Sequence, residues 1–355
     1  MKKATFIGFG DFAVERRKIK SEFFNQINLL IDWHPITKII DKHYVKGQSA
    51  TGAPSYPGLL LFKIELLQSW YGLSDYEVED QVNDRISFSK FVGLSLDDKS
   101  PDHSVVSRFR TELTQKGVYD ELHKEFVNQL ERHNIIVKTG GLIDASITDS
   151  PRKPKGKPQH EVVVDRAEES RPEGEAKKEE AQVKLIKKEQ PGVDSEGRWV
   201  KKGKKLRYGY KKHIVTDNEG MILGLLTTAA NVNEIANLDD VLDTCQLPKG
   251  TPLAGDKGYQ SAGNRELLKI RKLKSRIMHK AAKGRKLTEW EKKYNKAISS
   301  FRYKVERTFG GMKRWFGAGT ARYVGLAKTH TQHMMEAMAY NLYRSPGIVA
   351  SCREN

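Results

Sequence analysis

Long apolar runs broken by short polar turns dominate the first 135 residues, and this pattern predicts packed helices. The run Tyr56–Tyr71 is apolar on nearly all sides, which is typical of a mostly buried helix. Gly72 should end that helix. Ser74-Asp-Tyr-Glu77 has the serine and glutamate spacing of a capping box and should begin the next one.

A further helix is expected from Asp102 to Leu113, and it carries Arg108 and Arg110. Short helices joined by glycine-containing turns, with arginines on the last one, are compatible with a helix-turn-helix that contacts DNA. The alternative is a structural bundle whose arginines are simply solvated. We interpret residues 1–135 as a helical DNA-binding domain.

The pattern changes to alternating strands and helices from about residue 136. Gly141–Ile147 predicts a strand, and Tyr208–Thr216 with Met221–Thr228 predicts a hairpin closed by a turn at 217–220. Further elements are expected in the order helix, strand, helix, strand, at 237–242, before Asp256, at 260–272 and at 275–279. A second capping box at 288–291 begins a long helix through Glu306. The chain is thus an all-α domain followed by an α+β or α/β domain over 136–345, with a tail at 346–355.

Residues 151–205 differ in composition and are dominated by Lys, Glu, Pro and Gly. Such a segment buries too little apolar surface to offset its ordering entropy, so we expect a flexible, charged insertion with a transient helix near 175–188. Its flanking clusters, Arg152-Lys-Pro-Lys155 and Lys201-Lys-Gly-Lys-Lys205, are candidates for phosphate contact.

Composition narrows the classes of function. The 355 residues carry a formal net charge of +17, which attracts polyanions such as DNA or RNA, although a merely basic protein would look the same. There is no run of eighteen apolar residues and no signal-peptide stretch, so we expect a soluble protein that is not exported. Two distant cysteines, Cys245 and Cys352, argue against a disulfide scaffold or a zinc finger.

Three carboxylates stand in unusual surroundings. Asp144 lies inside an apolar run, Asp256 ends a second short run, and Glu306 lies in a basic, aromatic stretch. Two aspartates and a glutamate from distant segments are a suitable ligand set for Mg²⁺-assisted phosphodiester chemistry. Arg302 and Lys313 share a helix face with Glu306, where cations could hold the DNA backbone. Taken singly, each acid has an ordinary alternative: a buried core aspartate, a turn aspartate, or a surface ion pair. Asp149 also competes with Asp144 on composition.

The chain resembles bacterial insertion-sequence transposases of the DDE class, and most closely the insertion sequence five family. The motifs that carry the resemblance are Ser55–Leu61, Gly72–Asp75, Pro101–Arg110, Gly141–Ser146, Tyr208–His213, Ala230–Glu234, Gly255–Tyr259 and Val305–Gly310, so nearly the whole chain is covered. Arg302, Glu306 and Lys313 match the family's glutamate-region pattern, whereas Ser299 occupies its tyrosine position.

The resemblance implies an RNase H-like catalytic domain, a mixed sheet with an antiparallel hairpin and flanking helices. It implies that Asp144, Asp256 and Glu306 are the catalytic, metal-binding triad, with Mg²⁺ as the cofactor and Mn²⁺ as a substitute. DNA contacts are expected from the basic and aromatic residues of the matched motifs: Arg302, Lys313, Arg108, Arg110, Lys257, Tyr259 and Lys212.

The expected function is therefore that of an enzyme that binds the terminal inverted repeats of a mobile element, cuts there and joins 3′-hydroxyls to target DNA. The expected partner is double-stranded DNA, bound by a homo-oligomer in the bacterial cytoplasm at the nucleoid, without a membrane. The alternatives are a domesticated DNA-binding regulator and an RNase H-like nuclease without strand transfer. The repeat and target sequences do not follow from the chain.

Overall fold

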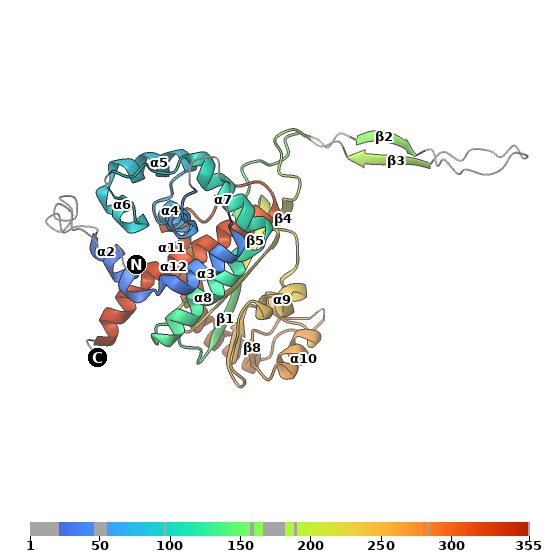
Figure 1. The fold of residues 1–355 in the computed structure, drawn as a ribbon. Coiled ribbons are helices and arrows are strands. Elements are labelled where there is room, and N and C mark those ends of the chain that lie inside the picture. The colour runs from blue at the N-terminus through green and yellow to red at the C-terminus, as the bar shows by residue number, and fades with distance from the viewer. Residues whose placement is uncertain are drawn as a thin grey trace, which may run out of the picture.

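The computed structural model describes residues 21–45, 55–95, 97–156, 160–165, 182–187, 190–282 and 284–353. Helices form the N-terminal part and surround a mixed sheet in the C-terminal part (Figure 1). The N-terminal helices are α2 (Ser21–Leu30), α3 (Trp33–His43), α4 (Gly58–Tyr71), α5 (Asp75–Asp84), α6 (Ile86–Val92), α7 (His103–Gln115) and α8 (Val118–Arg132).

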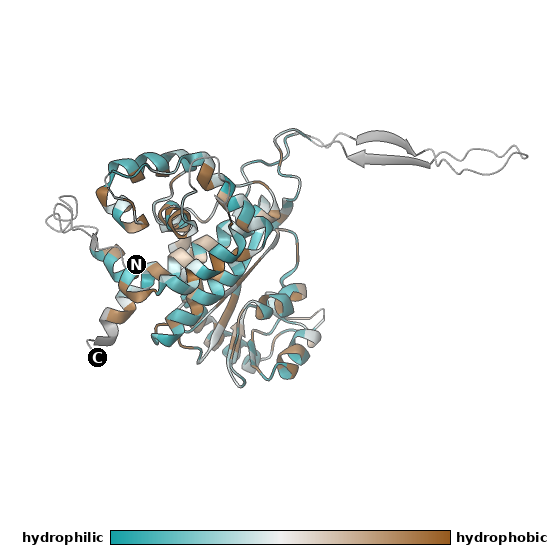
Figure 2. Cartoon of the chain, in the orientation of Figure 1, coloured by the Kyte–Doolittle hydropathy of each residue, from teal (hydrophilic) through white to brown (hydrophobic). Residues whose placement is uncertain are grey.

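The buried helix predicted at 56–71 is confirmed as α4, which is buried from Leu60 to Trp70. It ends at Gly72, whose φ of 69° lies in the left-handed region that glycine adopts without strain. The capping box of Ser74 and Glu77 begins α5, and the Asp102 side chain caps α7. In Figure 2 the visible turns of α4 are coloured as hydrophobic, and other helices surround them.

The main sheet contains β1 (Gly141–Asp149), β4 (Arg198–Lys202), β5 (Lys205–Thr216), β6 (Ile222–Ala229), β7 (Pro252–Gly255) and β8 (Lys274–Ile277). Strand β5 pairs with β1 on one side and with β4 and β6 on the other, always antiparallel. On its other edge β1 pairs in parallel with β7, which pairs in parallel with β8. This curled, mixed sheet with flanking helices has the predicted RNase H-like architecture.

Short helices connect the strands, and two long ones complete the fold. The 3₁₀ turn η1 (Glu234–Asn237) leads into α9 (Leu238–Asp243), η2 (Lys257–Tyr259) follows β7, and α10 (Ala262–Ile270) precedes β8. The last two helices are α11 (Glu289–Phe316) and α12 (Leu326–Arg353). Helix α12 packs on β5 and β6 and also on α2, α4, α7 and α8, so one hydrophobic core runs through both halves of the chain.

Two predictions differ from the structure. Strands β2 (His160–Asp165) and β3 (Gln182–Lys187) pair antiparallel in a separate two-stranded sheet, so the transient helix expected near 175–188 is wrong for 182–187. The rest of that helix prediction lies mainly outside the described residues. The tail expected from residue 346 is instead helical up to Arg353, because α12 continues through Pro346. Among the described residues, no helix is long and apolar enough to cross a membrane.

Candidate active site

Two of the three predicted acids are brought together by the pairing of β1 with β7. Within β1, only Gly141–Ile143 pair with β7, so Asp144 is the first residue of β1 beyond that pairing, and Asp256 directly follows β7. Gly255 allows the close approach, since a Cβ there would stand 2.8 Å from Cγ2 of Ile143. The end of β7 beside β1 thus places both aspartates next to each other.

Helix α11 supplies the third acid. It begins at the Thr288 capping box and packs on β1 and β7 through an apolar face that includes Ile298, Val305 and Met312. Arg302 and Glu306 lie four residues apart, so both project from one side of this helix. The side chain of Glu306 is 61% exposed, whereas that of Arg302 is 13% exposed.

One guanidinium group is shared by all three acids. Nη2 of Arg302 donates to Oδ2 of Asp144 at 2.8 Å and lies 3.7 Å from Oε1 of Glu306. Nη1 of Arg302 lies 3.5 Å from Oδ1 of Asp256. The other oxygen of Asp144 accepts the backbone N–H of Ala145 at 2.8 Å. Residues from positions 144, 256 and 302–306 therefore form one ionic cluster.

Burial and charge oppose each other in this cluster. Burial raises the pKa of Asp144, and the nearby Asp256 adds to the rise, although Arg302 and the Ala145 N–H counteract both. Burial alone would lower the pKa of Arg302, but the charges of Asp144, Asp256 and Glu306 outweigh it and raise that pKa. The Nε–H of Arg302 is buried and has no hydrogen-bond partner among the described residues. Among the described residues, the cluster therefore leaves one buried N–H donor without an acceptor.

The donor chemistry fits a divalent metal, because three carboxylates already share one cation, and carboxylate oxygens are the ligands that Mg²⁺ prefers. Within the described part of the chain, no group of three or more His, Cys, Asp or Glu residues is close enough to hold a metal in this arrangement. The guanidinium of Arg302 lies among the carboxylates where such an ion would have to bind.

Tyr259 lies beside the acids but is internal. It is 1% exposed, and its hydroxyl lies 3.2 Å from Nδ1 of His213, whose Nε2 lies 3.1 Å from Oγ1 of Thr228. Burial lowers the pKa of His213 to about 4, and the charge of Lys211 contributes. The DNA contact predicted for Tyr259 does not agree with this burial, so we correct its role to support beneath the acids.

Lys212 is also corrected, because it is 1% exposed and forms an ion pair with Glu336 of α12. Its ammonium also donates to the carbonyl of Ala318 at 3.4 Å. Moving a buried lysine out of its ion pair would leave the partner carboxylate buried without a counter-charge, which costs free energy. Lys212 therefore fastens α12 to the sheet instead of contacting DNA.

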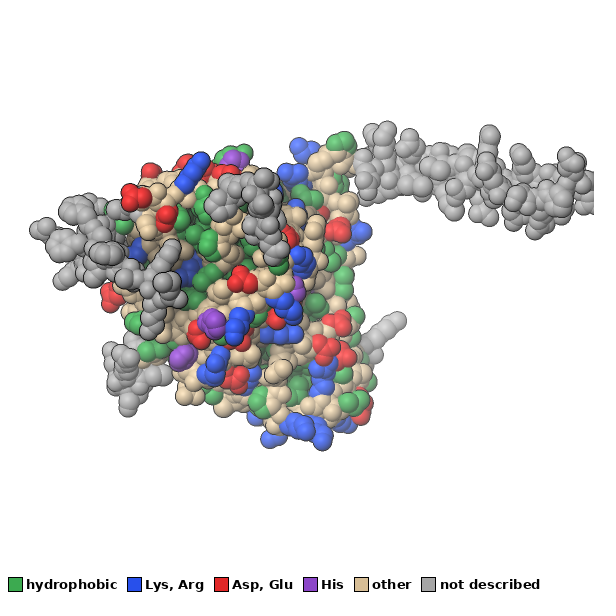
Figure 3. Space-filling view, in the orientation of Figure 1, with side chains coloured by type: hydrophobic (Ala, Val, Ile, Leu, Met, Phe, Trp, Pro, Cys, Tyr) green, Lys and Arg blue, Asp and Glu red, His purple; other side chains and the backbone are tan. Residues whose placement is uncertain are grey.

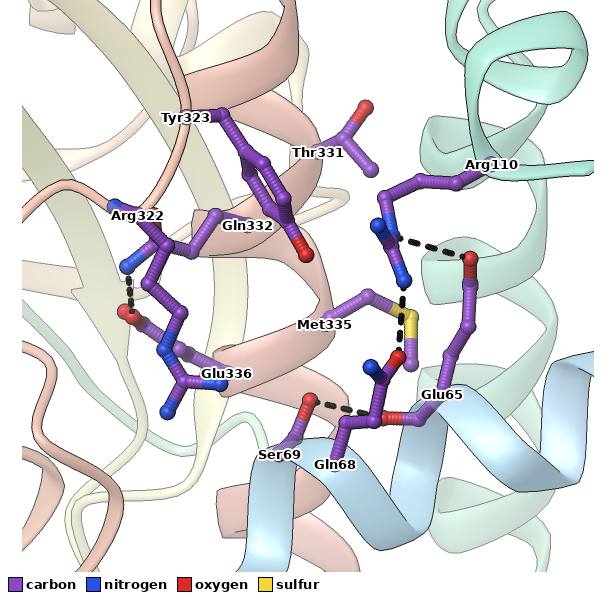
Figure 4. A pocket seen from close by; sticks show the side chains of 10 residues that line it. All are labelled: Glu65, Gln68, Ser69, Arg110, Arg322, Tyr323, Thr331, Gln332, Met335 and Glu336. Carbon is purple, nitrogen blue, oxygen red and sulfur yellow. Dashed lines mark hydrogen bonds and ion pairs between the residues drawn. The ribbon is translucent and has the colours of Figure 1, made fainter. Parts of the chain in front are cut away.

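Arg110 is the third correction, and Figure 4 shows it surrounded by side chains of α4 and α12. Its Nε lies 3.2 Å from Oε1 of Glu65, and its Nη2 donates to Asp75 at 2.6 Å and to Gln68 at 2.8 Å. The side chain is 7% exposed. The DNA contact predicted for Arg110 does not agree with this burial, because its donors are used inside the protein.

Of the four remaining predicted DNA contacts, Arg302 lies among the acids and the other three are at the surface. Arg108, Lys257 and Lys313 are exposed, and Arg108 lies at the border of a cleft between α4 and α7. Asp149, which competed with Asp144 in the sequence, pairs instead with Arg207 at 2.6 Å. On the face shown in Figure 3, basic and acidic side chains are interspersed, so that face carries no continuous basic patch.

Sequence reasoning gave no role to the pair of Glu234 and Lys211. Their Oε1 and Nζ atoms lie 2.8 Å apart next to the acids, and the charge of Glu234 contributes to the raised pKa of Tyr259. The available signal was Asn233, a capping residue that begins η1 and so positions Glu234. It marks a turn and does not reveal the distant lysine.

The chain matches two family models and shows distant similarity to solved structures. Residues 136–342, more than half of the chain, match the family model described as "Transposase DDE domain", and residues 12–112 match "Transposase domain (DUF772)". Among solved structures, the piggyBac transposase synaptic complex with hairpin DNA is 10% identical, with 94% of this chain and 76% of that chain covered and a TM-score of 0.43. The Mos1 strand transfer complex is 11% identical, with coverage of 86% and 81% and a TM-score of 0.23.

Proposed function

Because the chain belongs to the DDE transposase family, whose members cut and join DNA, we propose that Asp144, Asp256 and Glu306 are its catalytic carboxylates. The observation that carries this proposal is the shared ionic contact of all three with Arg302. Acids from three distant segments meet where β7 ends beside β1, partly buried and partly open to solvent. Such placement costs solvation energy and suits a site that recruits cations and phosphates.

We propose that the three carboxylates hold divalent metal ions, with Mg²⁺ as the ordinary ion and Mn²⁺ as a substitute. When bound, the ions would activate the attacking hydroxyl and stabilise the oxygen that leaves the phosphorus. The protein's own part is to hold Asp144 within β1, Asp256 at the end of β7 and Glu306 on α11, which are more rigid supports than loops. Tyr259 and His213 fill the space beneath them and keep their backbone in place.

Metal binding at this position requires Arg302 to leave the carboxylates. The guanidinium has an unsatisfied Nε–H, and a phosphate oxygen is a suitable acceptor for it. We therefore propose that Arg302 exchanges carboxylate contacts for the DNA backbone when metal and DNA bind. Lys313 and Lys257, which are both exposed, provide further backbone contacts.

The substrate that we propose is the pair of inverted repeats at the ends of a mobile element, read in part by the helical residues up to 135 through Arg108. Copies of the chain act together, since two ends must be handled at once. The insertion sequence five family is the group whose motifs the chain resembles. A regulator that has lost catalysis, or a nuclease that does not join ends, is the alternative.

The test uses duplex DNA that carries the repeat flanking the gene. We expect Asp144→Asn, Asp256→Asn and Glu306→Gln each to abolish cutting while end binding persists, because each change keeps the shape of the side chain and removes its charge. Asp240→Asn, an exposed carboxylate on α9, is the matched control and should cut normally. Cutting by any of the three purified variants would contradict the assignment. Trapped joined products separate a transposase from a nuclease.

A further inference from the structure

A second charged group gathers at the far end of β1. Arg207 makes a bidentate contact with Asp149, the last residue of β1, through Nε at 2.7 Å and Nη2 at 2.6 Å. The N–H of Asp149 donates to the carbonyl of Gly319 at 2.9 Å, and a Cβ on Gly319 would stand 3.8 Å from Cγ of Lys313. Lys313 of α11 thus lies next to Arg207 of β5.

Lys202 joins this group from the paired strand β4. In the β4–β5 hairpin Val200 stands opposite Arg207 and Lys202 opposite Lys205, which places Lys202 near Arg207. Lys202 also lines a cleft of about 350 Å³ whose wall includes Ala145 and Ile147 of β1. We call Lys202, Arg207 and Lys313 the cation cluster. The hairpin therefore carries it beside the strand that holds Asp144.

The charges of the cation cluster are poorly balanced within the protein. Partial burial lowers the pKa of Lys313, and the positive charges of Arg207, Lys212 and Lys202 lower it further, with Asp149 opposing them. Lys212 has its own partner in Glu336. Three cations against one carboxylate leave a net charge of two (three minus one). Like charges held close together repel, and a polyanion relieves that repulsion.

The distance between the acids and the cation cluster indicates how many nucleotides of a bound DNA strand would separate the two. From Asp144 to Asp149 there are five residues of strand, about 17 Å at about 3.3 Å per residue. From Glu306 to Lys313 there are seven residues of helix, about 10 Å at about 1.5 Å per residue. Along the axis of duplex DNA each strand carries one phosphate per about 3.4 Å, so lengths measured along that axis correspond to about three to five nucleotides.

We propose that the cation cluster is a binding subsite for a backbone phosphate of the DNA strand, about three to five nucleotides from the bond at the carboxylates. This inference rests on the proposed function, because it takes the carboxylates as the point where the strand reacts. The subsite makes the hairpin of β4 and β5 part of the DNA-binding surface. It contacts phosphate and not bases, so it fixes the position of the strand without reading its sequence.

The test is a binding experiment that does not depend on cutting. The probe is a duplex that ends in the repeat flanking the gene, with a recessed 3′-hydroxyl as the reacting end. A single uncharged methylphosphonate is placed at each successive backbone position of either strand. Binding is measured for the unsubstituted protein and for Lys202→Gln. The matched control is Lys269→Gln, because Lys269 is an exposed lysine on α10.

With the full chain and Lys269→Gln, we expect a loss of affinity from methylphosphonates about three to five positions from the end, and that loss should be absent in Lys202→Gln. The salt dependence of Lys202→Gln binding should also be weaker by about one counterion. Identical profiles for Lys202→Gln and Lys269→Gln, or uniform weakening at all positions, would overturn the subsite. If Asp144→Asn still cuts, the proposed function fails separately, since this binding profile does not use cleavage.

Discussion

Replacing Arg302 by methionine should show directly how much the three acids lower the free energy of unfolding when their shared cation is removed. Methionine keeps much of the side-chain volume beside Met278 and removes the charge that the acids share. At 2.8 Å and an effective dielectric constant of about 20, the contact of Arg302 with Asp144 has a Coulomb energy of about 6 kcal/mol before desolvation. Asp256 and Glu306 are 35% and 61% exposed, so solvent screens their contacts to roughly 1 kcal/mol or less each.

Desolvation of the buried pair offsets much of this attraction. Removing one partner of a buried ion pair costs about 3–5 kcal/mol, because the other charge is left uncompensated. Asp144 can reduce this cost by taking up a proton, since its pKa is already raised by burial. We therefore expect Arg302→Met to lower the free energy of unfolding by about 3 kcal/mol in metal-free solution, at the low end of that range.

Added Mg²⁺ should then restore much of the loss, because an ion can take the position that the guanidinium leaves. At a hundred times its dissociation constant an ion contributes about 2.7 kcal/mol to stability. The full chain should gain less, since the ion must first displace Arg302. Urea unfolding followed by tryptophan fluorescence, with chelator and with Mg²⁺, measures both effects. Combining Arg302→Met with Asp144→Asn should abolish the gain from Mg²⁺.

Two results would refute this reasoning. One is an Arg302→Met variant as stable as the full chain in chelator, which would mean that the ionic cluster contributes nothing net. The other is an equal gain from Mg²⁺ in both proteins, which would mean that the guanidinium and the metal do not compete for the same carboxylates.

Three further outcomes are expected from the same kind of measurement. Since the pKa of Asp144 is raised, its contribution to stability is fully present below about pH 3.8 and is lost as the pH rises through the higher folded pKa, so Asp144→Asn should flatten the dependence of the urea midpoint on pH in that range. Burial raises the pKa of Glu65 from 4.5 to about 7, so stability should fall by about 3 kcal/mol as the pH rises across that interval, and Glu65→Gln should remove this slope; equal slopes would contradict it. Gly209 has a φ of 147°, and a Cβ there would overlap the carbonyl oxygen of Thr148, so Gly209→Ala should lower the unfolding free energy by at least about 2 kcal/mol in a melting experiment.

Features set by nearby residues could be predicted from the sequence. The capping boxes at Ser74 and Thr288 mark the starts of α5 and α11, because the residues that form them are only three positions apart. The hairpin of β5 and β6 was predicted for the same reason, with Gly220 in the turn at a φ of 82°. The spacing of Arg302 and Glu306 was likewise visible along one helix.

Contacts between distant residues could not be predicted in this way. Lys212 looks like a free cation in its motif, but its partner Glu336 lies 124 residues later. Arg110 stands at a helical position that could face either solvent or α4, and the choice depends on Glu65 and Asp75. The contact between Arg302 and Asp144 joins residues 158 positions apart, so the most informative feature of the site needed the fold.

Helix α12 also constrains how such a chain can diversify. It is fastened to the N-terminal helices by the hydrogen bond from Trp70 to the carbonyl of Ala339 and by the contact between Thr114 and Thr331, and to β5 by Lys212. Recombination that exchanged the first 135 residues for those of another lineage would have to preserve the contacts between α12 and the N-terminal helices on both partners. New DNA preferences are therefore expected to arise by single substitutions on exposed positions such as Arg108, and less by wholesale shuffling of the N-terminal part.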